Sequence, residues 1–168
     1  MSKTAIIYSF NTKKTSKVAV QLQEGFNDPA IEMINAEEIT EDLFLSFDRI
    51  IMGVATWFDG ELPNFWDEFV PALEDMDLAG KKFALFGLGD QKGYPENFLD
   101  GVGIMAEILE AQGATLVGLT STEGYTFESS RALRNDQFLG LAIDYENQGS
   151  MNNQRVTSWI DQLRKEFA

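Results

Sequence analysis

The segment Ser-Phe-Asn-Thr-Lys-Lys-Thr at residues 9–15 is rich in hydroxyl, amide and ammonium groups. It follows an apolar run of strand length and precedes a segment with helical spacing. Hydroxyls beside the free N–H groups and positive dipole end of a helix favour a bound anion, such as phosphate. The spaced glycines of a P-loop are missing, so a Ser/Thr-rich helix cap is the competing interpretation.

Two further loops carry planar aromatic side chains. Residues 55–63 contain Trp57, whose ring could stack on a planar ligand, although a lone tryptophan more often packs against a helix. Residues 87–97 contain three glycines, which let a backbone approach a ligand closely, together with Asp90 and Tyr94. Asp90 could accept a hydrogen bond from a ring N–H, and the alternative is a glycine-rich turn with an exposed tyrosine.

The sequence contains no cysteine and no histidine. These absences exclude disulfides, thiolate nucleophiles, cysteine-ligated iron–sulfur clusters and histidine acid–base catalysis. Any redox chemistry must therefore belong to an organic cofactor. A hydroxyl-rich loop and two aromatic residues at one edge of a sheet suit a mononucleotide with a planar ring, and flavin mononucleotide (FMN) is the natural candidate.

Strand-length apolar runs alternate with helix-period segments along the chain. The expected strands lie at residues 5–8, 31–34, 49–54, 83–88 and 115–119, and the expected helices at 13–26, 38–45, 64–75, 99–112 and around 156–167. Ile104, Ile108 and Leu109 are expected to face inward. Continuous apolar strands separated by helices predict an α/β fold, a doubly wound parallel sheet in one domain over residues 1–168. Ligands of such sheets bind beyond the carboxyl ends of the strands, where the three loops fall.

Residues 120–137 interrupt the alternation because they are polar and rich in turn-forming residues. A further apolar stretch follows at residues 138–143. We expect an insertion that splits the fifth strand.

The charge of the chain restricts its partners. There are 13 basic and 27 acidic residues, giving a formal net charge of -14. Such a field repels nucleic acid and anionic membranes and speeds encounters with basic surfaces; the alternative interpretation is solubility or an acid-rich host proteome. The N-terminus shows no apolar signal segment, and no run approaches the roughly 18 apolar residues of a membrane helix. We expect a cytoplasmic monomer with neither nucleic-acid nor membrane partners.

Several segments, in order along nearly the whole chain, resemble the flavodoxin family and specifically its long-chain class. The most specific are Ala55-Thr56-Trp57 with Gly60-Glu61-Leu62, and residues 86–91 with Gly93-Tyr94 and Glu96-Asn97. Residues 121–125 and 140–144 also match, and the insertion at 120–137 resembles the loop that distinguishes long-chain members. The resemblance implies a five-stranded sheet of order 2-1-3-4-5 and a non-covalently bound FMN.

By this resemblance, residues 10–15 would hold the flavin phosphate, and Trp57 and Tyr94 would enclose the isoalloxazine ring. Asp90 would lie near N3 of the ring, and Glu146 near the ribityl chain. The full set implied to bind the cofactor is Phe10, Asn11, Thr12, Lys13, Lys14, Thr15, Thr56, Trp57, Phe58, Asp59, Gly60, Leu88, Gly89, Asp90, Tyr94, Asn97 and Glu146.

Two residues of the phosphate loop depart from the family's pattern. Phe10 stands where the family has a hydroxyl, and Lys13 where it has a glycine. Phe10 keeps its backbone N–H, and Lys13 fits only if its φ is negative, as at the start of a helix. We expect a loop that still binds phosphate.

The resemblance implies an electron carrier rather than an enzyme. Its partners would be redox proteins with basic docking surfaces, such as a ferredoxin-NADP reductase or ferredoxin-dependent oxidoreductases. Residues 57–78 contain seven acids and no base, which predicts a strongly reducing couple because the acids disfavour added negative charge. The turn at Phe58-Asp59 needs a residue that tolerates positive φ, and Asp59 is the better suited.

Two alternatives remain open. One is a flavodoxin-like NAD(P)H:quinone reductase, although rings of Trp57 and Tyr94 on both sides of the flavin would block a hydride donor. The other is a flavin-free binding module, which Phe10 and Lys13 suggest.

Overall fold

A computed structural model describes residues 2–168, so Met1, which the expected domain includes, lies outside the described residues. The chain forms a parallel sheet of order β2-β1-β3-β4-β5. Its strands are β1 (Thr4–Tyr8), β2 (Glu32–Asn35), β3 (Arg49–Gly53), β4 (Lys82–Leu88) and β5 (Thr115–Val117). The expected doubly wound α/β fold and its strand order are confirmed.

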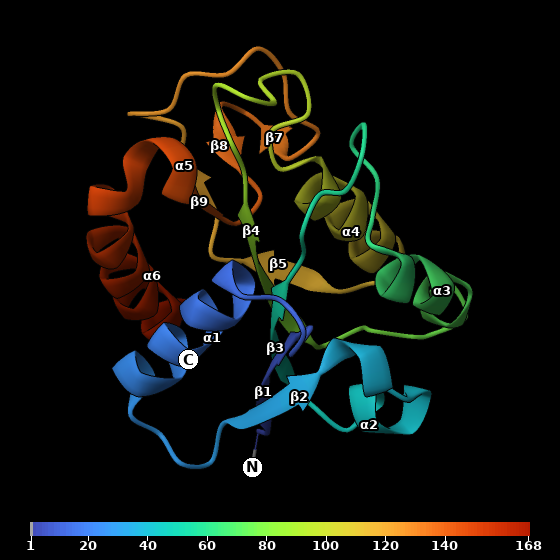
Figure 1. Ribbon diagram of the computed structural model, residues 1–168. Helices are drawn as coiled ribbons and strands as arrows, with labels where there is room; N and C mark the ends of the chain where they lie inside the picture. Colours follow the sequence, from blue (N-terminus) through green and yellow to red (C-terminus); the bar gives the residue numbers. More distant parts are fainter. Residues whose placement is uncertain (1) are drawn as a thin grey trace.

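Helices cover both faces of the sheet (Figure 1). Helices α1 (Lys14–Phe26) and α6 (Asn152–Glu166) lie together on one face, and α2 (Glu41–Leu45), α3 (Asn64–Leu73) and α4 (Asp100–Ala111) lie on the other. Successive residues of β1 point to opposite faces, so Ile6 joins one buried cluster and Ile7 the other. Both faces are covered, which explains why the strands are apolar at consecutive positions. No helix within residues 2–168 is long and apolar enough to cross a membrane.

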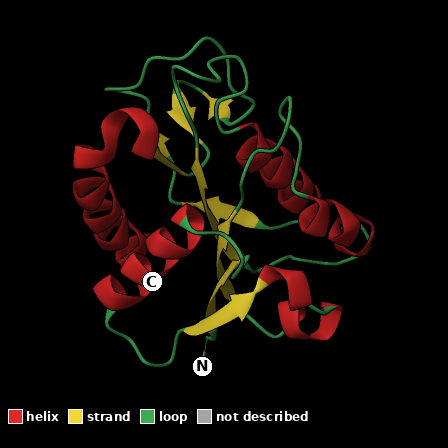
Figure 2. Cartoon of the chain, in the orientation of Figure 1, coloured by secondary structure: helices red, strands yellow, loops and turns green. Residues whose placement is uncertain are grey.

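The parallel register brings the carboxyl ends of neighbouring strands to one edge of the sheet. Tyr8 at the end of β1 pairs with Asn35 at the end of β2. Gly53 at the end of β3 pairs with Phe86 in β4. The loops that follow these strands, green in Figure 2, therefore meet beyond the same edge.

Helix α4 packs all three residues expected to face inward against the core, but it does not bury them equally. Ile104 and Ile108 are half-buried at the flank of the helix, and only Leu109 of the three expected residues is fully buried. The stripe that faces the core is Val102, Met105, Ala106 and Leu109. This helix is apolar on more than one face, so helical spacing alone does not identify the face against the sheet.

The insertion splits the fifth strand, as expected. β5 pairs with the first half of β4, whereas β9 (Leu141–Ile143) pairs with its second half, from Phe86 to Leu88. Between them, β6 (Thr120–Ser121), β7 (Leu133–Arg134) and β8 (Gln137–Phe138) form a small antiparallel sheet. The apolar stretch at residues 138–143 is thus shared between β8 and β9. The 3-10 turns η1 (Ala36–Glu38) and η2 (Gly149–Met151) and the short helix α5 (Tyr145–Gln148) complete the chain.

Candidate functional site

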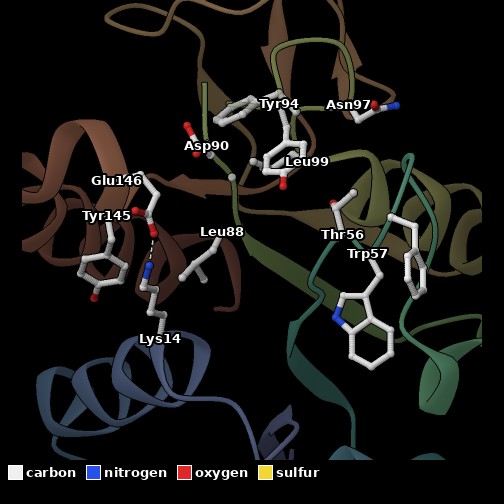
Figure 3. Close-up of a pocket in the computed structure, with 13 residues that line it drawn as sticks. Lys14, Thr56, Trp57, Leu88, Asp90, Tyr94, Asn97, Leu99, Tyr145 and Glu146 are labelled. Carbon is white, nitrogen blue, oxygen red and sulfur yellow. Dashed lines mark hydrogen bonds and ion pairs between the residues drawn. The ribbon is translucent and has the colours of Figure 1, made fainter. Parts of the chain in front are cut away.

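A cavity of about 580 Å³ opens at the carboxyl edge of the sheet. Its walls are Lys14, Thr56, Trp57, Phe58, Leu88, Gly89, Asp90, Tyr94, Asn97, Phe98, Leu99, Tyr145 and Glu146. They come from the segments that follow β1, β3, β4 and β9, as expected for ligand sites of doubly wound sheets. Figure 3 shows Trp57 and Tyr94 on different sides of the cavity. Its volume is typical of a small-molecule or cofactor site.

Three cavity residues were not expected from the sequence. Phe98 and Leu99 continue the loop after β4 and were missed because apolar residues next to a helix suggest core. Leu99 has a φ of 57°, a backbone feature that its residue type does not indicate. Tyr145 is a further aromatic beside Glu146, and this adjacency was the available signal.

The loop after β3 is a tight hairpin. The Trp57 N–H donates to the Glu61 carbonyl at 2.8 Å, and the Glu61 N–H donates back to the Trp57 carbonyl at 2.7 Å. Within the hairpin, Phe58 has a φ of 51° and Gly60 a φ of 92°. The expectation that Asp59 would take the positive φ is therefore wrong. The paired hydrogen bonds hold Phe58 in a backbone region that large side chains rarely adopt, and the residue is 75% exposed.

The start of helix α4 packs against the segment that carries this hairpin. The Gly101 N–H donates to Thr56 Oγ1 at 2.9 Å. A Cβ atom at Gly101 would lie only 2.3 Å from the Ala55 carbonyl oxygen, so the helix start requires glycine for this close approach. Asn97 Nδ2 donates to the Asp59 carbonyl at 3.2 Å. The loops after β3 and β4 are thus joined by hydrogen bonds at the rim of the cavity.

Asp90 organises the loop after β4. Its Oδ1 accepts from the Gly93 N–H at 2.8 Å, from the Lys92 N–H at 3.2 Å and from Asn147 Nδ2 at 2.8 Å. These bonds, with that from Gly93 the strongest, hold the pKa of Asp90 below its usual value. Asp90 is therefore an ionised hydrogen-bond acceptor in the cavity wall at neutral pH.

A buried polar network lies behind Asp90. Asp144 has no exposed surface, and its Oδ2 accepts from the N–H of Gln91 at 3.1 Å and from Gln91 Nε2 at 2.8 Å. Burial acts to raise the pKa of Asp144, but hydrogen bonds from Asn147 and Gln91 outweigh it and hold this pKa below its usual value. Gln91 Oε1 accepts from the Thr126 N–H at 2.6 Å, so the insertion also braces the cavity loop.

Of residues 9–15, only Lys14, the first residue of α1, lines the cavity. Lys14 pairs with Glu146 at one side of the cavity, as the dashed line in Figure 3 shows. Lys13 has a φ of -84° immediately before α1, which is the negative value that we expected of a lysine in this position. The Phe10 N–H, the donor that this residue keeps in place of a hydroxyl, donates to Asn35 Oδ1 at 3.2 Å.

The remaining residues expected at the site lie outside the cavity walls. They are Phe10, Asn11, Thr12, Lys13, Thr15, Asp59 and Gly60. At the start of α1, the N–H groups of residues 13–16 have no acceptor among residues 2–168, as the first turn of a helix leaves them.

Known proteins match the chain over nearly its full length. The flavodoxin family model matches residues 6–159. A flavodoxin of Synechococcus elongatus is 39% identical to this chain, and the match covers 99% of both chains. A flavodoxin of Klebsiella pneumoniae is 36% identical, and the match covers 98% of both chains. The crystal structure of Fusobacterium nucleatum flavodoxin bound to flavin mononucleotide has a TM-score of 0.92 and 30% identity, and covers 99% of both chains. On these matches, this chain belongs to the flavodoxin family.

Proposed function

We propose that this chain holds FMN in the cavity at the carboxyl edge and carries electrons between redox proteins. One observation carries the proposal: a cavity of about 580 Å³ has Trp57 and Tyr94 in its walls and opens beside the start of α1. FMN supplies the one-electron chemistry, since the chain has no cysteine to hold an iron–sulfur cluster. The family assignment makes the protein an electron carrier rather than an enzyme, so the quinone reductase alternative is set aside.

The ring end of the cavity is suited to a planar, hydrogen-bonding ligand. Trp57 and Tyr94 offer aromatic faces, and Asp90 offers a carboxylate acceptor to a ring N–H. Gly89 leaves backbone accessible between them. Thr56, Phe58, Asp59, Gly60, Leu88 and Asn97 complete the proposed ring contacts.

The phosphate end combines a helix start with a lysine. The N–H groups of residues 13–16 and the positive end of the α1 dipole favour an anion, and Lys14 adds a full charge. Lys13 at negative φ permits this geometry without glycine. We place the phosphate against residues 10–15, with Glu146 beside the ribityl chain.

The surface around the cavity favours a basic partner. The seven acids between residues 57 and 78 are all exposed, and Phe58 at the rim is 75% exposed. We propose a strongly reducing couple and docking to basic redox proteins, such as a ferredoxin-NADP reductase or ferredoxin-dependent oxidoreductases. We also propose a cytoplasmic, monomeric, single-domain protein of the long-chain class.

The visible spectrum of the purified protein tests the proposed site. We expect a yellow protein with one FMN per chain. A chain that binds no FMN at millimolar FMN would be a flavin-free module and would refute the proposal. Steady NADPH oxidation without a separate reductase would instead indicate an enzyme.

A further inference from the structure

The segment that begins with the last residue of β2, Asn35, lies beside the loop after β1, because the two strands are parallel neighbours. Two side chains of this segment bind the loop. Asn35 Oδ1 accepts from the Phe10 N–H at 3.2 Å and from the Glu37 N–H at 3.2 Å, so one oxygen joins the loop to η1. Glu37 Oε2 accepts from the Ser9 hydroxyl and, at 2.8 Å, from Asn11 Nδ2. An acid 26 to 28 residues further along the chain thus binds the expected phosphate loop twice.

Ser9 is the residue through which Glu37 acts on the rest of the loop. Ser9 is 2% exposed, and its hydroxyl oxygen accepts from the Asn11 N–H at 3.3 Å. Its carbonyl accepts from the Thr12 N–H at 3.2 Å and from the Thr12 hydroxyl at 2.7 Å. Because the Ser9 hydroxyl donates its only proton to Glu37, its lone pairs are left for Asn11. The Ser9 hydroxyl therefore links the Glu37 carboxylate to the Asn11 N–H.

These bonds occupy only the first half of the loop. The N–H groups of residues 10–12 all have acceptors in the protein. Those of residues 13–16 have none within the described part of the chain and remain free for an anion. An anion site is strongest when its donors are already aligned before binding. Ordering the first half of the loop fixes the direction in which the second half begins.

We propose that Glu37 is a positioning residue for the flavin phosphate, acting through Ser9 and Asn11, and that it strengthens the preference for FMN over riboflavin. This inference rests on the phosphate site proposed above. Electrostatics alone predicts the opposite, because a carboxylate repels a phosphate. Glu37 is exposed, however, so water and salt screen its repulsion, whereas the order that its hydrogen bonds impose on the loop is not screened.

The carboxylate form is the one present at neutral pH. Hydrogen bonds from Ser9 and then Asn11 hold the pKa of Glu37 below its usual value. A glutamine in the same place would keep an oxygen acceptor but lose the charge. An alanine would lose both. A comparison of the glutamine and alanine variants therefore separates the effect of hydrogen-bonded positioning from the effect of charge.

Competition between two flavins on the holoprotein tests the proposal. Each protein is equilibrated with FMN and a large excess of riboflavin, and the flavins retained by ultrafiltration are measured by chromatography. We expect Glu37→Ala to lower the preference for FMN by about tenfold, because two hydrogen bonds to the loop are lost. We expect Glu37→Gln to stay within about threefold of the wild type. Riboflavin affinity itself, which involves no phosphate, should not change.

Glu38→Ala is the matched control. Glu38 is the neighbouring exposed acid and makes no hydrogen bond to the loop within residues 2–168, so its removal changes the net charge equally. The proposal is overturned if Glu37→Ala keeps or raises the preference for FMN over riboflavin. It is also overturned if Glu38→Ala loses this preference too, or if Glu37→Gln lowers it as much as Glu37→Ala does. A wild type that retains both flavins equally would overturn the phosphate site itself, and this inference with it.

Discussion

Two acids brace loops at the carboxyl edge of the sheet, and they differ in burial. Asp144 behind the proposed ring end has no exposed surface, whereas Glu37 beside the proposed phosphate loop is exposed to solvent. A buried carboxylate must have its hydrogen bonds satisfied, so Asp144 is coupled to the stability of the whole fold. An exposed carboxylate adds little to stability, so it can adjust a loop without much effect on folding. The difference predicts that changes at the ring end affect stability and flavin binding together, whereas changes at Glu37 affect specificity alone.

The largest effect is expected from Asp144→Asn. One carboxylate oxygen would become an amide NH₂ that faces a backbone N–H donor, either that of Gln91 at the Oδ2 position or that of Asn147 at the Oδ1 position. We expect the free energy of unfolding to fall by about 2 to 4 kcal/mol, measured by urea denaturation. Asp161 forms an exposed ion pair with Arg164, and Asp161→Asn should leave the free energy of unfolding unchanged within the error of the measurement. Equal stability of Asp144→Asn and the wild type would remove the contrast between the two acids.

The pH dependence of the free energy of unfolding should reveal the contribution of the Asp144 carboxylate. The pKa of Asp144 is lower in the folded protein than its ordinary value, so the unfolded state binds more protons as the pH falls. The contribution of Asp144 to the free energy of unfolding is therefore complete above its pKa in the unfolded state, which is about 4. This contribution is lost as the pH falls through the lower pKa of the folded state. We expect the stability of the wild type to fall more steeply below about pH 4 than that of Asp144→Asn. Parallel acid profiles for the two proteins would contradict this.

Tyr94→Ala should weaken flavin binding at the ring end. We expect the dissociation constants of FMN and riboflavin both to rise by about tenfold, because one aromatic wall of the cavity is lost. The preference between the two flavins should stay unchanged, which is the reverse of the result expected for Glu37→Ala. Tyr94→Phe keeps the ring and is the control. A change in the FMN-to-riboflavin ratio would place Tyr94 at the phosphate instead.

Asp59→Asn should have the smallest effect. Asp59 is exposed in the hairpin after β3, and its charge disfavours further negative charge in the cavity. We expect potentiometry to find the more negative one-electron potential raised by about 20 to 60 mV, where about 59 mV corresponds to a tenfold change in equilibrium constant. Asp28→Asn removes an equal charge beyond the carboxyl end of α1 and should leave the potential unchanged. No shift for Asp59→Asn would exclude this acid as a contributor.

Hairpin geometry marks a limit of prediction from sequence. Trp57 and Tyr94 were expected in the site from their motifs, and both line the cavity. The choice of Asp59 for the left-handed backbone followed residue preference, yet Phe58 takes it. Preferences of this kind amount to about 1 to 2 kcal/mol, and a hairpin closed by two hydrogen bonds can override them. Residue type alone therefore cannot decide which peptide of a tight turn is strained.

The sequence by itself determined the sheet, the three loops and the family. Apolar runs at residues 49–54 and 83–88 could only be buried strands, and a lysine at position 13 required a negative φ. Only the tertiary structure decided what braces the loops. Glu37 reaches Ser9 because β1 and β2 are parallel neighbours, and Asp144 reaches Gln91 because β9 pairs with the end of β4. Such contacts depend on strand order and register, which bring together residues that no local pattern connects.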